Sequence, residues 1–87
     1  MPYRIELKPA AIRDLRKVPR PEQKRIARKI DALASNPRPR GAKKLEAQNN
    51  LWRIRVGDYR VVYQPQGKVL LVLVVRVLHR GKVYQVL

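Results

Sequence analysis

Hydrophobic and polar residues follow two different periods along this chain, and the changes of period mark its elements. Residues 3–8 alternate strictly, with Tyr3, Ile5 and Leu7 on one face. Alternation with a period of two is typical of a strand that buries one face. We therefore predict that a half-buried strand comes first.

The period then lengthens to that of a helix. Pro9 suits the first position of a helix, because that position needs no N–H donor. Ile12, Leu15 and Val18 follow at intervals of three and predict an apolar stripe on a helix over residues 10–18.

A second helix is predicted over residues 21–35, where Ile26, Ile30 and Leu33 recur at intervals of four and three. Pro37 ends it, because a residue before proline avoids the helical region. The short connection between the two helices indicates an αα-hairpin packed on one side of a sheet.

The middle of the chain predicts a β-hairpin with one apolar and one basic face. Residues 51–56 alternate, so that their side chains point in opposite directions. One face carries Trp52, Ile54 and Val56, and the other carries Leu51, Arg53 and Arg55. Gly57 and Asp58 suit a tight turn whose first central residue has positive φ, and residues 59–63 begin the returning strand.

Other sequence patterns predict the remaining strands and turns of the sheet. Residues 42–47 predict either a short edge strand or an irregular segment, and residues 48–50 and 65–67 predict turns. Residues 68–78 are almost continuously β-branched or leucine, which is typical of a strand at the centre of a sheet. Residues 83–87 can form a last short strand.

These elements predict a single domain over residues 1–87 of the α+β class, in the order β-α-α-β-β-β. The N-terminal strand precedes a helical hairpin, and a mainly antiparallel sheet of three to four strands follows. Segregated helices cover one face of such a sheet, which leaves the other face for function. A chain of 87 residues can bury one modest core.

Composition narrows the choice of partner. The 21 Lys and Arg residues against 6 Asp and Glu give a formal charge of +15, which favours a polyanionic partner: nucleic acid, an acidic protein or both. The chain has no cysteine and one histidine, so disulfides and thiolate zinc sites are excluded, and we expect no metal or other cofactor. No apolar run is long enough to cross a bilayer, so we expect a cytoplasmic protein without a membrane partner.

Two motifs on this frame resemble the RelE/ParE toxin superfamily. Residues 51–63, LWRIRVGDYRVVY, are similar to its sheet signature, and residues 77–84, VLHRGKVY, are similar to its C-terminal HR…VY element. The leading strand, the helical hairpin and Lys43-Lys44-Leu45 before the β-hairpin fit as well. The resemblance implies a RelE-like fold over nearly the whole chain.

The resemblance also implies the toxin half of a type II toxin–antitoxin system. RelE-like members are mRNA interferases that enter the ribosomal A site and cut messenger RNA by metal-independent attack of the ribose 2′-hydroxyl. The partners implied are a cognate acidic antitoxin, messenger RNA and the 70S ribosome, and we expect a toxin–antitoxin hetero-oligomer.

Residues of this chain that match the functional positions of the superfamily are catalytic candidates, and His79 is an additional candidate. The set is Arg53, Arg55, Arg60, Arg80 and Tyr84. The best-known ribosome-dependent members have lysines where this chain has Arg53 and Arg55. Arginine stays protonated, so these two suit phosphate clamping and transition-state stabilisation, and proton abstraction falls to Tyr84, His79 or a ribosomal group.

Two other functions remain open from the sequence. A ParE-like member would poison DNA gyrase without cutting nucleic acid, and a basic RNA-binding protein would bind without catalysis. Single residues have structural alternatives too. Arg60 could pair with Asp58 or Glu46, and Arg76 could be a charge at the end of the sheet. Trp52 favours the core over base stacking.

Overall fold

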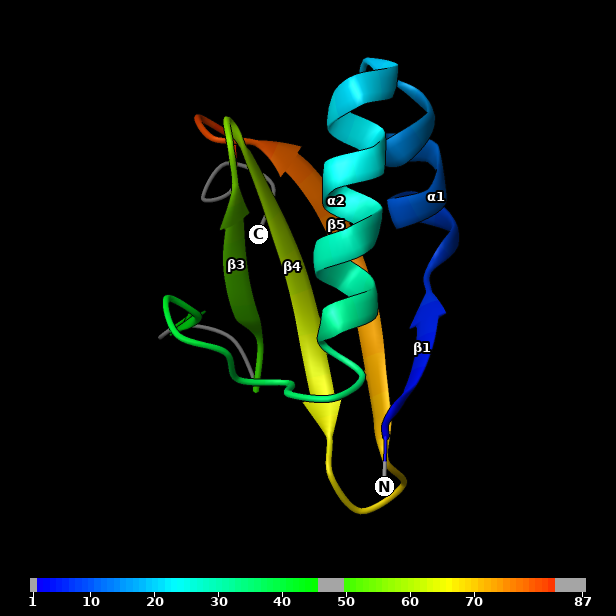
Figure 1. Cartoon of the computed structure of the whole chain (residues 1–87), viewed down its shortest axis with the longest axis vertical. Helices are drawn as coiled ribbons and strands as arrows, with labels where there is room; N and C mark the ends of the chain where they lie inside the picture. The colour runs from blue at the N-terminus through cyan, green and yellow to red at the C-terminus, as the bar shows by residue number, and fades with distance from the viewer. Residues whose placement is uncertain (1, 46–49, 83–87) are drawn as a thin grey trace.

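A computed structural model of the protein describes residues 2–45 and 50–82 (Figure 1). Its elements are β1 (Arg4–Leu7), α1 (Pro9–Arg16), α2 (Arg20–Ala32), β2 (Lys43–Lys44), β3 (Trp52–Val56), β4 (Tyr59–Gln66) and β5 (Leu71–His79). Within the described residues the five strands form one sheet in the order β1-β5-β4-β3-β2. The predicted α+β class is confirmed, with more strands than the three to four expected.

The sheet is mixed, because β1 pairs with β5 in parallel while the other pairs are antiparallel. The parallel register runs from Arg4 opposite Leu71 to Leu7 opposite Val74. Strand β5 therefore lies inside the sheet, as its apolar sequence predicts. The predicted strand at residues 83–87 lies outside the described residues.

Helix α2 lies across one face of the sheet, with α1 beside it (Figure 1). Ile26, Ile30 and Leu33 are buried, as the helical period predicts. The helix ends at Ala32 and not at residue 35. After it the chain tightens, because the backbone N–H groups of residues 33–35 each donate to a carbonyl three residues earlier.

The apolar stripe predicted for α1 is wrong at one position. Ile12 is 40% exposed, whereas Ala11 and Val18 are buried and Leu15 is partly buried. The face of α1 that meets the sheet therefore carries Ala11. Its small side chain allows the helix to lie close to β5.

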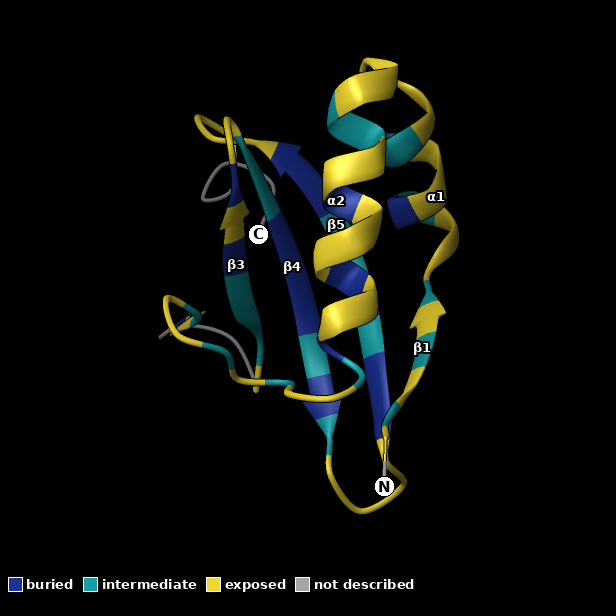
Figure 2. Ribbon diagram, in the orientation of Figure 1, coloured by how far each residue is buried: buried dark blue, intermediate teal, exposed yellow. Residues whose placement is uncertain are grey.

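The main core lies between the helices and the sheet (Figure 2). The apolar side of β3 contributes Ile54 and Val56, with Trp52 packed against them. Tyr63 is fully buried, and its hydroxyl donates to the carbonyl of Pro37 at 2.7 Å, which fastens the loop after α2 to the sheet. Burial raises the pKa of Tyr63 to about 12.

The two hairpin turns differ in how well the sequence predicts them. Gly57 has φ +58°, as expected for the turn between β3 and β4. The turn predicted at residues 65–67 lies later in the chain, because β4 continues through Pro65 to Gln66 and β5 begins only at Leu71. Within the described residues β3 pairs with β4 only as far as Tyr63, so Pro65 has no strand partner on that side, and a proline is tolerated there. The carbonyl of Pro65 accepts instead from Asn50 Nδ2 at 2.6 Å.

Candidate functional site

The two faces of β3 differ as its alternation predicts. Arg53 and Arg55 project from the face opposite the core cluster that holds Ile54. Strand pairing places Arg53 opposite Val62 and Arg55 opposite Arg60. Three arginines thus lie on two adjacent strands of a rigid sheet, on the face away from the helices.

Arg60 lies at the centre of this group. Burial lowers the pKa of Arg60 below its ordinary value, and three neighbouring guanidinium groups lower it further. In order of effect these belong to Arg55, Arg53 and Arg80. The four residues, which we call the arginine cluster, share one positive field. Arg60 Nη1 also donates to the carbonyls of Tyr59 at 3.2 Å and Gly57 at 3.5 Å, which orients its side chain.

Arg80 reaches the cluster through the β3–β4 turn. Its backbone N–H donates to the carbonyl of Asp58 at 2.8 Å, and its Nη1 lies 3.9 Å from Asp58 Oδ1. Both side chains are more than half exposed, so the ion pair is weak. Asp58 therefore positions Arg80 through the backbone and leaves its guanidinium available to another anion.

A small second core supports the strands on the arginine face. Val62 and Leu78 are buried there with Leu45, which follows β2. Val62 pairs with Arg53 and Leu78 pairs with Arg60. The guanidinium groups are therefore anchored beside packed apolar side chains. The alternation of apolar and polar residues did not predict this second core.

His79 lies away from the arginine cluster. It is opposite Tyr59 across β4 and β5, and the two rings make an edge-to-face contact at 5.5 Å. With Glu22 and Pro19 it lines a hollow of about 220 Å³ on the helical side of the sheet. The structure thus does not bring His79 together with Arg60. Tyr84 lies outside the described residues, so its role remains a prediction from the sequence.

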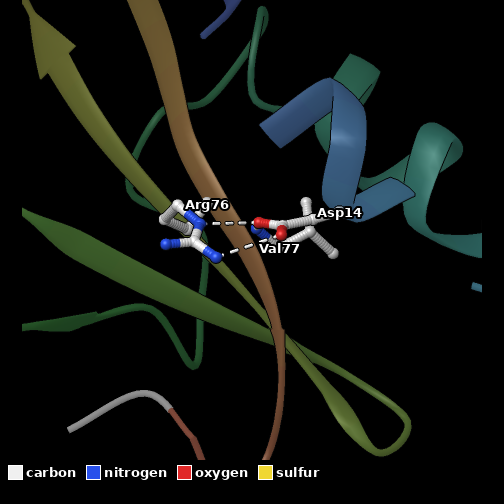
Figure 3. Close-up of polar contacts among 3 residues, drawn as sticks. All are labelled: Asp14, Arg76 and Val77. Atoms are coloured by element: carbon white, nitrogen blue, oxygen red, sulfur yellow. Dashed lines mark hydrogen bonds and ion pairs between the residues drawn. The ribbon is translucent and has the colours of Figure 1, made fainter. Parts of the chain in front are cut away.

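Arg76 has a structural partner (Figure 3). Asp14 accepts hydrogen bonds from its Nε at 2.8 Å and its Nη2 at 3.1 Å, and a third from the backbone N–H of Val77 at 2.9 Å. Burial acts to raise the pKa of Asp14, but these hydrogen bonds and the positive charges of Arg76 and Lys17 together hold that pKa below its ordinary value. Asp14 thus fastens α1 to β5, a role that sequence spacing did not indicate.

Trp52 is not an open stacking platform. Its ring packs against the main core, and the guanidinium carbon of Arg38 lies 5.2 Å from the ring centroid. Its Nε1 donates to Asn50 Oδ1 at 3.4 Å. The expectation that Trp52 belongs to the core is therefore confirmed.

Two other kinds of site are absent from the part of the chain that the structure describes. No group of three histidine, cysteine or carboxylate side chains there is arranged to hold a metal ion. Neither of the two helices has the length and apolar character needed to cross a membrane.

The sequence of this chain is similar to those of known toxins. Residues 5–84 match the family model described as the ParE toxin of the type II toxin–antitoxin system parDE. A curated relative from Methanocaldococcus jannaschii, described as toxin RelE1, is 29% identical over 66 residues, which span 72% of this chain and 73% of that protein.

Two solved structures are also similar. One is the archaeal RelE–RelB complex from Pyrococcus horikoshii, with a TM-score of 0.82, 30% identity and coverage of 94% of this chain and 99% of that one. The other is the toxin–antitoxin complex RelBE2 from Mycobacterium tuberculosis, with a TM-score of 0.81, 28% identity and coverage of 92% and 100%.

Proposed function

The chain belongs to the ParE toxin family of type II toxin–antitoxin systems, within the RelE/ParE superfamily, and from this premise we propose that it is a ribosome-dependent RNA endonuclease. The observation that carries the proposal is the arginine cluster. Arg60 lies in the field of three other guanidinium groups, on a sheet face that the helices leave open. Such a site favours a ligand with closely spaced negative charges, and RNA has them.

The proposed partners follow from the relatives. The similar structures from Pyrococcus horikoshii and Mycobacterium tuberculosis are complexes of a toxin with its antitoxin. We extend this arrangement to the present chain, with a cognate acidic antitoxin in a hetero-oligomer. Its charge of +15 suits such a partner as well as messenger RNA on the ribosome.

The proposed reaction needs no metal. The ribose 2′-oxygen attacks the adjacent phosphorus, the P–O5′ bond breaks, and a 2′,3′-cyclic phosphate and a free 5′-hydroxyl result. The 2′-hydroxyl proton leaves to a base, and the departing 5′-oxygen takes a proton from an acid. Charge builds on the phosphoryl oxygens during the step, so preorganised positive donors lower the barrier.

The arginines can supply that stabilisation but not the base. A guanidinium stays protonated and presents several N–H donors that suit bidentate contact with phosphate. Arg60, which its own backbone contacts orient, is assigned to the phosphoryl oxygens, with Arg53, Arg55 and Arg80 around them. Tyr84 is assigned as the acid for the 5′-oxygen, since a phenol is protonated at neutral pH.

A ParE-like inhibitor of DNA gyrase is the second candidate, because the family model that matches is that of the ParE toxin. The two candidates share a fold, so the fold does not discriminate between them. They differ in whether the chain itself breaks a phosphodiester.

Mapping transcript 5′ ends after a short pulse of expression tests the proposal. We expect new 5′ ends inside open reading frames that disappear when translation is blocked. Gyrase supercoiling is measured in parallel with purified protein. Inhibited supercoiling without new 5′ ends would establish the second candidate, and cleavage that persists without translation would contradict ribosome dependence.

A further inference from the structure

A hollow of about 340 Å³ lies between the end of α1 and the last residues of β5, and the proposed reaction does not use it. Strand β1 pairs with β5 only as far as Val74, so within the described residues β5 has no strand partner on that edge from residue 75 onward. Val77 belongs to the main core and Leu78 to the second core, and both line the hollow. The hollow therefore extends around the edge of the sheet, from the helical face toward the arginine face.

The walls of the hollow are held in place from two sides. Gln23 Nε2, on α2, donates to the carbonyls of Leu15 at 2.7 Å and Val18 at 2.8 Å, which fixes the chain where α1 ends. On the other side Asp14 accepts from the backbone N–H of Val77 at 2.9 Å (Figure 3). That bond occupies a group at which a further strand would pair, so this edge suits a ligand that side chains hold.

The lining of the hollow is positively charged. Among the described residues that line it, the single carboxylate, that of Asp14, is already bonded to Arg76. Lys17 and Lys82 have no ion pair within those residues. The backbone N–H of Lys82 donates to the carbonyl of His79 at 2.9 Å, and this turn brings the lysine back to the end of β5. Two ammonium groups without a counterion at one hollow favour a phosphate.

The remaining lining is apolar and aromatic. Val18 and Val77 are buried beside it, and the rings of Tyr59 and His79 line it in edge-to-face contact. Aromatic side chains beside cations are the combination that binds single-stranded nucleic acid, because the rings contact bases while the cations contact phosphates. Binding sites for small molecules have volumes of about 300–1,000 Å³, and this hollow is at the lower end, as one nucleotide requires.

The hollow lies at the same end of the sheet as the arginine cluster. Leu78, which lines it, pairs with Arg60 across β4 and β5. Arg80, a member of the cluster, comes directly after His79 in the chain. A strand of RNA on the arginine face therefore reaches the hollow by passing over the edge of β5.

We propose that this hollow binds one nucleotide of the RNA strand that the arginine cluster holds. Lys17 and Lys82 contact its phosphate, and its base lies against His79. Naming RNA as the ligand rests on the proposed function, whereas the volume, charge and position of the hollow do not. The strand thus bends over the edge of the sheet, and the hollow adds affinity at a phosphate other than the one that is cut.

The test measures binding of RNA to the full chain by fluorescence anisotropy. The probe is a single strand of twelve nucleotides whose 2′-oxygens carry methyl groups, so that it is not cleaved. We compare Lys17→Gln/Lys82→Gln with Lys8→Gln/Lys68→Gln, a control of equal charge whose two lysines are exposed and do not line the hollow. We expect binding about tenfold weaker for the first pair and changed by less than about twofold for the control. Equal weakening by both pairs overturns the location.

The contact with the base is tested separately. His79→Ala should weaken binding of the probe about fivefold, because stacking on an aromatic ring acts through the base. The same substitution should leave binding of a strand of equal length without bases unchanged. An equal loss for both strands overturns the assignment of His79.

Two further arms separate the sources of the nucleotide and the two proposals. Purified ribosomes without messenger RNA offer ribosomal RNA as the other source. If the lysine pair weakens binding to these ribosomes and not to the probe, the shared strand is overturned and ribosomal RNA is the occupant. Arg60→Ala reports on the arginine cluster in the same assay. Weaker binding for Arg60→Ala together with unchanged binding for the lysine pair overturns this inference and leaves the proposed function standing, whereas a wild-type chain that binds no RNA overturns both.

Discussion

Arg60 lies in the field of the other three clustered arginines, and its side chain donates to two backbone carbonyls. We predict that Arg60→Ala and Arg80→Ala each abolish growth inhibition while the protein stays folded. Loss of one positioned donor typically costs about 3 kcal/mol, or roughly 10²-fold in rate. Growth is compared at equal expression, with Arg13→Ala on α1 as control. Growth arrest as strong as wild type in both variants would show that the site is misassigned.

Two substitutions at Arg55 distinguish the effect of its charge from that of its bidentate geometry. Lysine keeps the positive charge but loses the bidentate fork, and glutamine loses the charge. We predict that Arg55→Lys retains part of the cleavage rate, whereas Arg55→Gln loses nearly all of it. Single-turnover cleavage on programmed ribosomes measures both. A faster Gln variant than Lys variant would contradict an electrostatic role.

The sequence predicted where some of the candidate residues lie on the sheet. Alternation alone placed Arg53 and Arg55 on one face, and the tight turn at Gly57 brought Arg60 opposite Arg55. It could not reveal that His79 faces the helical side, because a β-bulge between Val62 and Tyr63 shifts the register of β4 against β5. A bulge changes which face a strand residue occupies without leaving a clear sequence signal.

At the scale of elements, the contact between α1 and β5 depends on Asp14. The folded state lowers the pKa of this carboxyl, so its stabilising contribution is complete above the unfolded value of about 4 and is lost as pH falls below it. We predict that Asp14→Asn lowers the free energy of unfolding by about 2 kcal/mol at pH 7. The loss should shrink below about pH 4.

Urea unfolding near pH 7 and near pH 3 measures this effect. Glu6→Gln is the matched control, since the Arg4–Glu6 pair is at least half exposed on both sides and such pairs contribute little. A deficit for Asp14→Asn that is equal at both pH values, or one no larger than that of Glu6→Gln, would contradict the assignment.

Hydrophobic periodicity predicts which elements form better than it predicts where they begin and which side they bury. The periods of two and 3.6 located both helices and the β3–β4 hairpin. They missed the exposure of Ile12, because a helix presents whichever side lets it pack closest, here the side of Ala11. They also began β5 too early, because Val69 and Leu70 read as strand yet form a turn in which Leu70 takes φ +51°. The parallel pairing of β1 with β5 is a long-range contact that no local window contains.

For the molecule as a whole, a charge of +15 on a body of 33 × 28 × 25 Å makes binding of polyanions depend on salt. If the four clustered arginines each neutralise one phosphate, the logarithm of the affinity for single-stranded RNA should fall with a slope of about −3 against the logarithm of salt concentration. An RNA whose 2′-oxygens carry methyl groups measures this without cleavage. Arg60→Ala should reduce the magnitude of the slope by about 0.7, and an unchanged slope would remove Arg60 from the phosphate contacts.

The parallel pair of β1 and β5 has a consequence for the order of synthesis. Residues 4–7 leave the ribosome early, but their strand partner is residues 71–74, so the sheet cannot close until almost all of the chain has been translated. Arg80 follows β5 in the chain, so its contact with the β3–β4 turn also forms only when almost all of the chain has been made. Contacts so distant in sequence form late in folding. Under the proposed ribosome-dependent activity, a nascent copy is thus not yet folded while it is still attached to the ribosome that is making it.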